Sequence, residues 1–316
     1  MPVTARVETP LTRRHNRRAT RAAIATAIGA GLVLGGAAAA PAAQERPHAT
    51  PIVIGTKNVT EQYVLGQLYR QALEATGLTV GYKENIAGTE VIVSSLLSGK
   101  ITAYPEYTGI MLTDTFGRES TPKTAKATYE LARSLWGKRG YVLGNQTPFQ
   151  HVDAVAVLRT TATRYGLRTI ADLKKVPDLT LAALPEFEPR QTGLVGIKRV
   201  YGVANVEFKP LAGISPYTLL DKKRVLAAGI FSTDPQLSAT RYVVLRDPKN
   251  VFGFQHVAPI VSKNVIVENP TVLPTLNRVS ALLTNKAMIA MNKAVVLDRK
   301  TPAKVAGAFL QANGLK

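Results

Sequence analysis

The sequence has no cysteine and only four histidines among its 316 residues. Without cysteine the chain cannot form a disulfide, a thiolate metal site, an iron–sulfur cluster or a cysteine nucleophile. The histidines lie too far apart in the sequence to form the closely spaced pairs of a zinc motif. These are His15, His48, His151 and His256. We therefore expect neither a metal centre nor a bound cofactor.

Short signatures of catalysis are also missing. The chain has no G-x-S-x-G elbow, no phosphate-binding P-loop and no paired histidines on one helix. A hydrolase or transferase is the main alternative of another class, because a fold does not determine a function. With no acid–base pair identifiable from spacing alone, we predict that the protein is not an enzyme.

Residues 1–43 differ in composition from the rest of the chain. Several arginines, among them the pairs Arg13-Arg14 and Arg17-Arg18, precede a run at 22–40 that is rich in alanine and glycine, followed by Ala40-Pro41-Ala42. This order is typical of a cleavable export signal, cut near Ala42 or Ala43. We expect an exported protein, periplasmic or extracellular, with no lipid-attachment cysteine. Both the general and the twin-arginine export routes stay open.

Positive charge is in excess, with 40 Lys and Arg against 21 Asp and Glu. The chain remains basic without residues 1–43, which hold six arginines and one glutamate. Its basic residues are dispersed, and the densest clusters are Lys174-Lys175 and Lys222-Lys223-Arg224. No nucleic-acid-binding motif accompanies them, so they are typical of solvated faces. Binding to a polyanion of the cell envelope is a third interpretation, and it predicts a steep salt dependence.

Strands alternating with helices predict the fold class. The first part reads as strands at 52–55, 78–82 and 101–104, with helices ending near Gly77, at 88–98 and at 124–136. The second reads as strands at 152–158, 179–184, 206–208 and 229–231, with helices at 169–173, up to 200 and at 215–228. An apolar run at 256–267 and helices at 270–283, 285–297 and 302–313 follow. Such alternation predicts α/β lobes with right-handed crossovers.

The C-terminal helices leave no room for a third sheet, which indicates that the chain returns to the first lobe. We assign residues 44–152 and 257–316 to lobe one and 153–256 to lobe two. Two crossovers between two lobes make a hinge. The sequence therefore predicts two α/β lobes that can close on one another.

Residues 103–112, reading AYPEYTGIML, fall where a predicted strand ends and a helix begins. Ligands bind at such strand ends in open α/β sheets. Tyr107 can present there a ring face that attracts a cation. Lys57 follows the first strand, just before a helix that Asn58 is expected to cap with Glu61 three residues on. A tyrosine packed under a loop and a solvated lysine are the alternatives for these two residues.

Four motifs together resemble the substrate-binding proteins of osmoprotectant ABC importers, of the glycine betaine, carnitine and choline type. They are IGTKNVTEQYVLG at 54–66, GTE at 88–90, YPEYTG at 104–109 and FSTD at 231–234. The resemblance covers roughly residues 52–315. It implies a two-lobe class II periplasmic-binding-protein fold that captures a small quaternary-ammonium compound and delivers it to an ABC permease with its ATPase. We also expect a monomer that does not bind nucleic acid.

The resemblance assigns roles to five of seven candidate site residues. Tyr107 and Tyr217 look like two walls of an aromatic cage, and Phe231 stands where the family usually has a third tyrosine. Arg190 resembles the family's carboxylate clamp, and Lys57 a second carboxylate contact. The remaining two ligand-binding candidates are Thr233, from the FSTD motif, and Asp153.

Asp153 marks a departure, because the family commonly has a cage tyrosine there, and an acidic residue two places earlier where this chain has His151. A carboxylate supplies no ring face, but it can balance an ammonium charge or accept a hydrogen bond from the ligand. If Asp153 faces the site, its charge needs the ligand cation, a ligand N–H group or Lys57. Glycine betaine, choline, carnitine, a betaine with a polar side group and an ergothioneine-like betaine all remain candidates.

Overall fold

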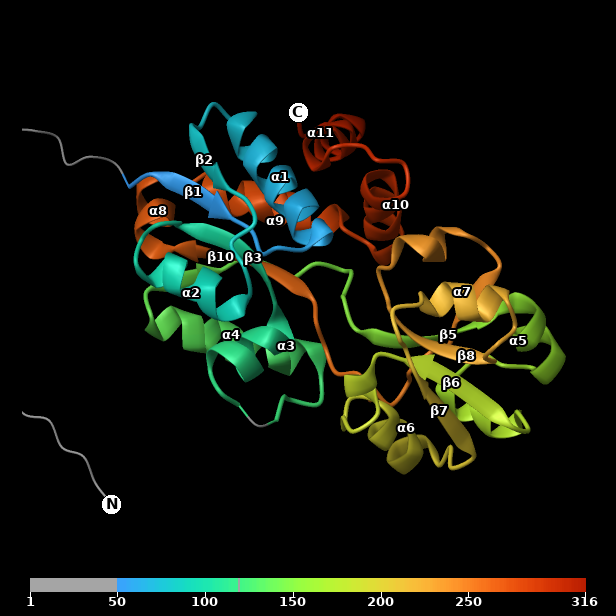
Figure 1. The fold of residues 1–316 in the computed structure, drawn as a ribbon. Helices are drawn as coiled ribbons and strands as arrows, with labels where there is room; N and C mark the ends of the chain where they lie inside the picture. Colours follow the sequence, from blue (N-terminus) through green and yellow to red (C-terminus); the bar gives the residue numbers. More distant parts are fainter. Residues whose placement is uncertain (1–49, 119) are drawn as a thin grey trace, which may run out of the picture. The chain divides into compact units, whose positions relative to one another are not determined.

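The structure is a computed structural model that describes residues 50–118 and 120–316. All of these residues belong to one unit, 48–316. The predicted export signal at 1–43 lies outside the described residues. Figure 1 shows the described chain coloured along the sequence.

The first sheet contains five strands in the order β2-β1-β3-β10-β4. Its strands are β1 (Ile52–Gly55), β2 (Val80–Lys83), β3 (Ala103–Tyr107), β4 (Tyr141–Leu143) and β10 (Val257–Ser262). β1 runs parallel to β2 and β3, whereas β10 is antiparallel to both β3 and β4. A strand from late in the chain therefore lies inside a sheet built from its beginning (Figure 1).

The second sheet also contains five strands, in the order β7-β6-β8-β5-β9. Its strands are β5 (Asp153–Leu158), β6 (Leu179–Ala183), β7 (Val206–Pro210), β8 (Ala227–Phe231) and β9 (Tyr242–Val244). β5 is antiparallel to β8 and β9, and its first residue, Asp153, pairs with Phe231 at the end of β8. This register brings two of the predicted site residues to the same sheet edge.

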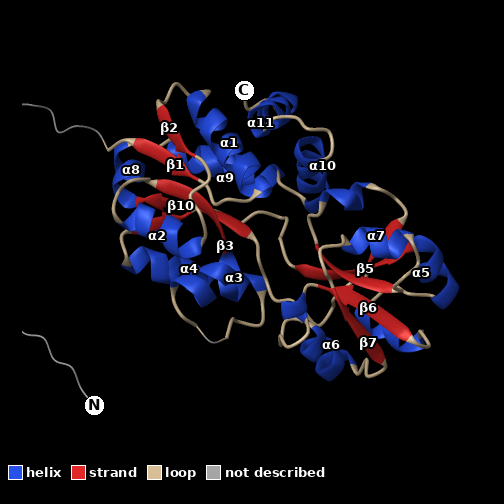
Figure 2. Cartoon of the chain, in the orientation of Figure 1, coloured by secondary structure: helices blue, strands red, loops and turns tan. Residues whose placement is uncertain are grey.

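Helices accompany both sheets (Figure 2). Those of the first part are α1 (Thr60–Glu74), α2 (Thr89–Leu97), α3 (Thr108–Ile110), the π-helical turn Met111–Thr115 and α4 (Ala125–Lys138). The second part has α5 (Arg159–Tyr165), α6 (Leu194–Tyr201), α7 (Pro216–Asp221) and 3₁₀ turns at Ile170–Lys175, Pro185–Phe187 and Pro235–Ser238. The C-terminal helices are α8 (Lys263–Glu268), α9 (Val272–Leu282), α10 (Asn285–Val296) and α11 (Pro302–Ala312). Within the described ranges, every helix is too short or too polar to span a membrane.

The chain passes between the sheets twice, after β4 and after β9, and a bridge between Gln150 and His256 joins the two crossing segments. The predicted two-lobe α/β architecture with two crossovers is confirmed. We call the part around the first sheet lobe one and the part around the second lobe two. The predicted boundaries at 152–153 and 256–257 stay predictions.

Two local predictions are wrong. The helix predicted at 215–228 ends at Asp221, and Ala227 and Ala228 lie instead in β8. Alanine favours a helix locally, but here it fills the buried part of a central strand, so packing overrides propensity. Helix α1 is not capped by Asn58: its N-cap is Val59, which makes no side-chain cap.

Strand β3 is longer than predicted and includes Tyr104 to Tyr107. Pro105 lies in it opposite Pro259 of β10. The N–H group of Thr108 donates to the carbonyl oxygen of His256 at 2.8 Å, and hydrogen-bonded pairs alternate along an antiparallel ladder. The proline pair therefore falls at a non-hydrogen-bonded position, where the ladder between these two strands requires no N–H donor from either residue.

A buried ion pair ties the loop after β1 to β3. The Nζ atom of Lys57 lies 2.6 Å from Oε1 of Glu106, and the two side chains are 10% and 0% exposed. Lys57 also donates to Thr89 Oγ1 at 3.1 Å, and Glu106 accepts from the backbone N–H of Tyr107 at 2.8 Å. Burial raises the pKa of Glu106, and the Lys57 ammonium counteracts this only in part. The carboxylate depends on Lys57 to remain charged.

We expect Lys57→Met to destabilise the protein by about 3–5 kcal/mol, because it leaves a buried carboxylate without its partner. Urea unfolding at neutral pH measures this loss. The double variant Lys57→Met/Glu106→Gln removes both charges and should recover a large part of the stability. Equal losses in the single and the double variant would show that the ion pair is not the cause.

Candidate functional site

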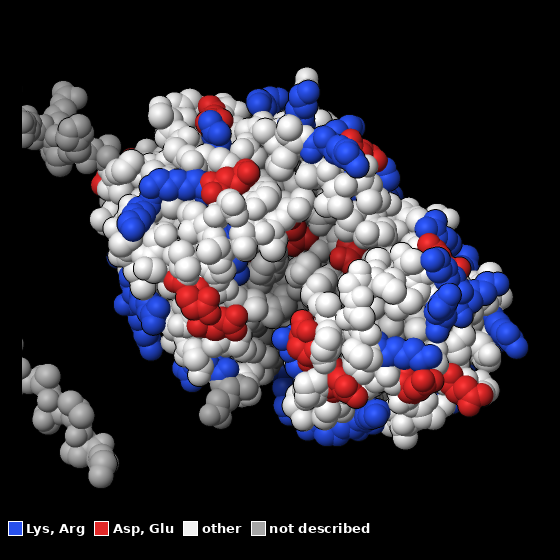
Figure 3. Space-filling view, viewed as in Figure 1, with Lys and Arg blue, Asp and Glu red and all other residues white. Residues whose placement is uncertain are grey.

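A cleft of about 520 Å³ lies between the lobes, and Figure 3 shows a hollow in which acidic atoms are visible. In lobe one, the end of β3 and the following turns form part of its wall. In lobe two, the start of β5 and the end of β8 do so. The crossing segments contribute as well. The lining includes Tyr107, Ile110, Thr113, Asp114, His151, Asp153, Arg190, Thr192, Phe231, Phe252, Phe254 and Gln255.

Three rings follow one another across this cleft. The ring of His151 stacks on Phe231, with centroids 4.8 Å apart and an interplanar angle of 16°. Its other neighbour is Tyr107, whose centroid lies 5.4 Å away at 37°. Tyr107 ends β3 in lobe one and Phe231 ends β8 in lobe two. His151 therefore lies between two aromatic rings supplied by different lobes.

Glu61 of α1 is the buried anion behind these rings. Its Oε1 atom accepts from the hydroxyl of Tyr107 at 2.9 Å, and its Oε2 atom accepts from the side-chain amide of Asn292 on α10 at 3.1 Å. Burial alone would raise the pKa of Glu61, but the nearby charge of His151, with the polar neighbours Thr233 and Asn292, outweighs burial and lowers it. Glu61 is thus an anion at neutral pH.

His151 completes this network. Its Nδ1 atom lies 2.6 Å from Oγ1 of Thr233 and 3.6 Å from Oε1 of Glu61. Burial lowers the pKa of His151, but Glu61, Asp234 and Asp153 together raise it above its ordinary value. The amide of Asn292 also donates to the backbone carbonyl of Thr233 at 3.0 Å. The network therefore joins both lobes and favours an imidazolium in the cleft.

Asp153 and Arg190 lie together at another part of the cleft and share a small side cavity of about 30 Å³ with Glu186. That space is sufficient for one water molecule. Burial raises the pKa of Asp153, and Glu186 raises it further, while Arg190 and His151 counteract this only in part. The net effect on the pKa of Asp153 is upward, so its neighbours stabilise the charged form only in part.

The structure brings four of the seven predicted site residues to the cleft surface: Tyr107, Asp153, Arg190 and Phe231. The other three lie behind the lining. Lys57 is held by Glu106, although its ammonium is 5.3 Å from the centroid of the Tyr107 ring. Thr233 is buried and contacts His151. Their direct contact with a ligand stays a prediction.

Tyr217, expected as a cage wall, is buried against Tyr242, with ring centroids 4.9 Å apart. Its hydroxyl donates to Oδ2 of Asp234 at 2.9 Å, and the same oxygen accepts from the backbone N–H of Phe231 at 3.1 Å. In this geometry Tyr217 supports the strand end that carries Phe231. A direct contact between Tyr217 and a ligand likewise stays a prediction.

Sequence reasoning did not include Glu61, His151 or Asn292 among the site residues. His151 was visible as a departure from the family pattern, and Glu61 as the supposed partner of a helix cap. The sequence around Asn292 does not indicate a site residue, because its contacts with Glu61 and Thr233 join positions more than 50 residues apart. These three residues meet only through tertiary packing.

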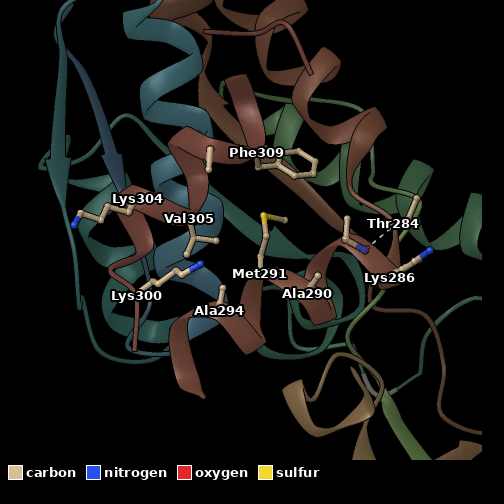
Figure 4. Close-up of a pocket in the computed structure, with 11 residues that line it drawn as sticks. Thr284, Lys286, Ala290, Met291, Ala294, Lys300, Lys304, Val305 and Phe309 are labelled. Atoms are coloured by element: carbon tan, nitrogen blue, oxygen red, sulfur yellow. Dashed lines mark hydrogen bonds between the residues drawn. The ribbon is translucent and has the colours of Figure 1, made fainter. Parts of the chain in front are cut away.

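A second hollow, of about 540 Å³, lies between α10 and α11 (Figure 4). Alanines, Met291, Val305 and Phe309 line it, and Lys286, Lys300 and Lys304 contribute ammonium groups. It shares no lining residue with the interlobe cleft. Its positive rim disfavours a cationic ligand, so the interlobe cleft is the better candidate site.

The chemistry available in the interlobe cleft is recognition. Aromatic faces attract a cation, the nearby carboxylates balance its charge, and an arginine binds a carboxylate. Within residues 50–118 and 120–316, no cluster of histidine and acidic side chains is suited to a metal ion.

Known proteins similar to this chain are binding and transport proteins. The glycine-betaine-binding protein of Pseudomonas aeruginosa is 28% identical over 280 residues, covering 85% of this chain and 89% of the relative. The ergothioneine transport permease/ergothioneine binding protein EgtU of Helicobacter pylori is 26% identical over 271 residues, 84% of this chain and 48% of its own length. The solved structure of apo YehZ from Escherichia coli has a TM-score of 0.75 and 27% identity, covering 85% of this chain and 100% of that one.

The similarity extends over almost the whole described chain. The family described as the substrate binding domain of ABC-type glycine betaine transport systems matches residues 50–312. This range includes both sheets and every residue of the cleft. The chain therefore belongs to that family and is a substrate-binding protein of this kind of ABC transport system.

Proposed function

We propose that the protein captures a small quaternary-ammonium compound in the interlobe cleft and delivers it, without chemical change, to an ABC permease with its ATPase. The observation that carries the proposal is that Tyr107 of lobe one and Phe231 of lobe two line the same cleft as Arg190. Two ring faces suit a trimethylammonium group, and the planar guanidinium fork suits a carboxylate.

Glycine betaine combines both groups within one small molecule, as do the related betaines. The names of the relatives from Pseudomonas aeruginosa and Escherichia coli support this class of ligand. The exported location, the permease and a monomeric state are parts of the same proposal, since proteins of this kind bind their ligand outside the cytoplasm.

A betaine that also donates a hydrogen bond is the second candidate. Asp153 supports it, because this carboxylate lines the cleft and its pKa is raised by burial and by Glu186. An N–H group of a ligand would donate a hydrogen bond to this carboxylate, in addition to the charge of Arg190 that already acts on it. An ergothioneine-like betaine has such a group, and the Helicobacter pylori relative is named for ergothioneine.

Ligand binding should raise the melting temperature. A ligand held in the cleft binds only the folded state, so a free concentration one hundred times the Kd adds ~2.7 kcal/mol of stability. Differential scanning fluorimetry with glycine betaine, choline, carnitine and ergothioneine measures this effect, with the uncharged analogue tert-butylacetamide as control. The absence of a shift with every one of the four compounds would contradict the proposed function.

Arg190→Ala should weaken the binding of glycine betaine by about 2 kcal/mol, because it removes a charge-assisted contact to the ligand carboxylate. The loss lies at the low end for such contacts because Arg190 is exposed. Choline has no carboxylate and should lose far less, as measured by calorimetry. The exposed Arg199 of α6 provides the matched control, since Arg199→Ala should change neither affinity. Equal losses for both ligands would assign Arg190 a structural role.

Asp153→Tyr should change the two ligand types in opposite directions. An added ring gives plain glycine betaine a cation–π contact of about 0.5–2 kcal/mol. Ergothioneine should bind the variant less tightly, because its N–H group loses the carboxylate that accepts it. Calorimetric titration of wild type and variant with both ligands measures the two changes. Unchanged affinities for both would place Asp153 outside the binding site.

A further inference from the structure

The side chain of His151 fills the place that the proposed function gives to the ligand's cation. Its centroid lies 4.8 Å from that of Phe231 and 5.4 Å from that of Tyr107. A protonated imidazole is a planar cation, and rings on both of its sides attract it as they would attract an ammonium group. A trimethylammonium group cannot enter between Tyr107 and Phe231 while the imidazole ring remains there.

Carboxylates from several elements act on His151. Glu61 of α1 lies 3.6 Å from its Nδ1 atom, and the charges of Asp234, in the turn after β8, and Asp153, at the start of β5, act on it from farther away. The hydroxyl of Tyr107 adds a neutral donor from β3, because burial raises the pKa of this tyrosine well above its ordinary value. The arrangement favours a positive charge at the position of His151.

The neighbouring cations have other partners. Lys57 pairs with Glu106 at 2.6 Å, and the charge of Arg190 acts on Asp153. Glu61, by contrast, has neutral donors in Tyr107 and Asn292 and its cationic neighbour in His151. The imidazolium of His151 thus balances the buried carboxylate of α1.

We propose that the His151 imidazolium is an internal occupant of the cation site, and that a quaternary-ammonium ligand binds by replacing it with release of one proton to solvent. This inference rests on the proposed function and adds a specificity determinant to it. When His151 loses its proton, it no longer interacts with Glu61 as a charge. The fixed positive charge of the ligand then interacts with Glu61 instead. The net charge beside Glu61 is then the same before and after binding.

Competition between the proton and the ligand sets the direction of the pH dependence. The competent form has a neutral His151, so the apparent Kd equals the intrinsic Kd divided by the neutral fraction. Below the pKa of His151 in the free protein, each unit of decreasing pH weakens binding about tenfold. Above that pKa the affinity becomes constant. Since the folded-state pKa is raised, the contribution of the imidazolium to stability is present at low pH and is lost as the pH rises through that value.

The test is calorimetric titration of wild type with glycine betaine between pH 5.5 and 8.5, in two buffers with different ionisation enthalpies. We expect about a tenfold gain in affinity per pH unit on the acid side and about one proton released per ligand bound. His151→Gln keeps a side chain that can hydrogen-bond to Thr233 but cannot titrate. It should bind with a flat pH profile and release no proton.

A second variant separates His151 from its acidic neighbours. Asp153→Asn removes a second titratable group of the cleft, whose pKa is raised by burial, and it should retain the slope of wild type. Glycine betaine binding with a flat profile in wild type, or with the same slope in His151→Gln, would overturn this inference and leave the proposed function intact. Failure of glycine betaine and the other three ligands to bind at any pH would overturn both.

Histidine NMR of the protein without added ligand gives an independent test. His151 should titrate above the ordinary pKa of histidine, and an ordinary or lower value would overturn the inference.

Discussion

The carboxylate of Glu61 is a buried charge whose partners come from four separate parts of the chain. Tyr107 is at the end of β3, Asn292 is on α10, His151 is on a crossing segment and Thr233 follows β8. A buried anion without such partners would cost several kcal/mol. Because the partners belong to both lobes, satisfying this one charge also determines how Tyr107 and His151 lie in the cleft.

The carboxylates of the site fall into two kinds. Hydrogen bonds and the charge of His151 lower the pKa of Glu61, whereas burial raises the pKa of both Asp153 and Asp234. Groups with opposite shifts in one site have different roles. The surroundings of Glu61 favour its charged form, whereas burial disfavours the charged form of Asp153. The site thus combines a carboxylate with polar and charged neighbours and one that burial leaves less stabilised.

The sequence predicted the alternating strands and helices well where a pattern is local. Strand β1 has the predicted bounds, and α10 and α11 differ from their predicted ends by one residue, because caps and apolar periodicity operate within a few positions. Ala227 and Ala228 were misassigned because their environment is set by strands β5 and β6.

The candidate site shows the same division. The family resemblance brought Tyr107, Asp153, Arg190 and Phe231 to attention, and these four residues line one cleft. It did not indicate that Glu106 holds Lys57, because that pair forms between residues 49 positions apart. Nor did it place the His151 ring between Tyr107 and Phe231, since side-chain positions of this kind depend on contacts across both lobes.

The opposed prolines of β3 and β10 have a consequence for how the ring of Tyr107 is maintained. Successive strand residues point to opposite faces, so a slip of one residue would exchange the faces of Glu106 and Tyr107. Such a slip would also move Pro105 or Pro259 to a position where the ladder needs an N–H group. A misaligned pairing therefore carries two costs: side chains on the wrong face and a missing N–H donor in the ladder. The opposed prolines thus preserve the register that directs the ring of Tyr107 to the cleft side of β3, and the hydrogen bond to Glu61 then holds its hydroxyl.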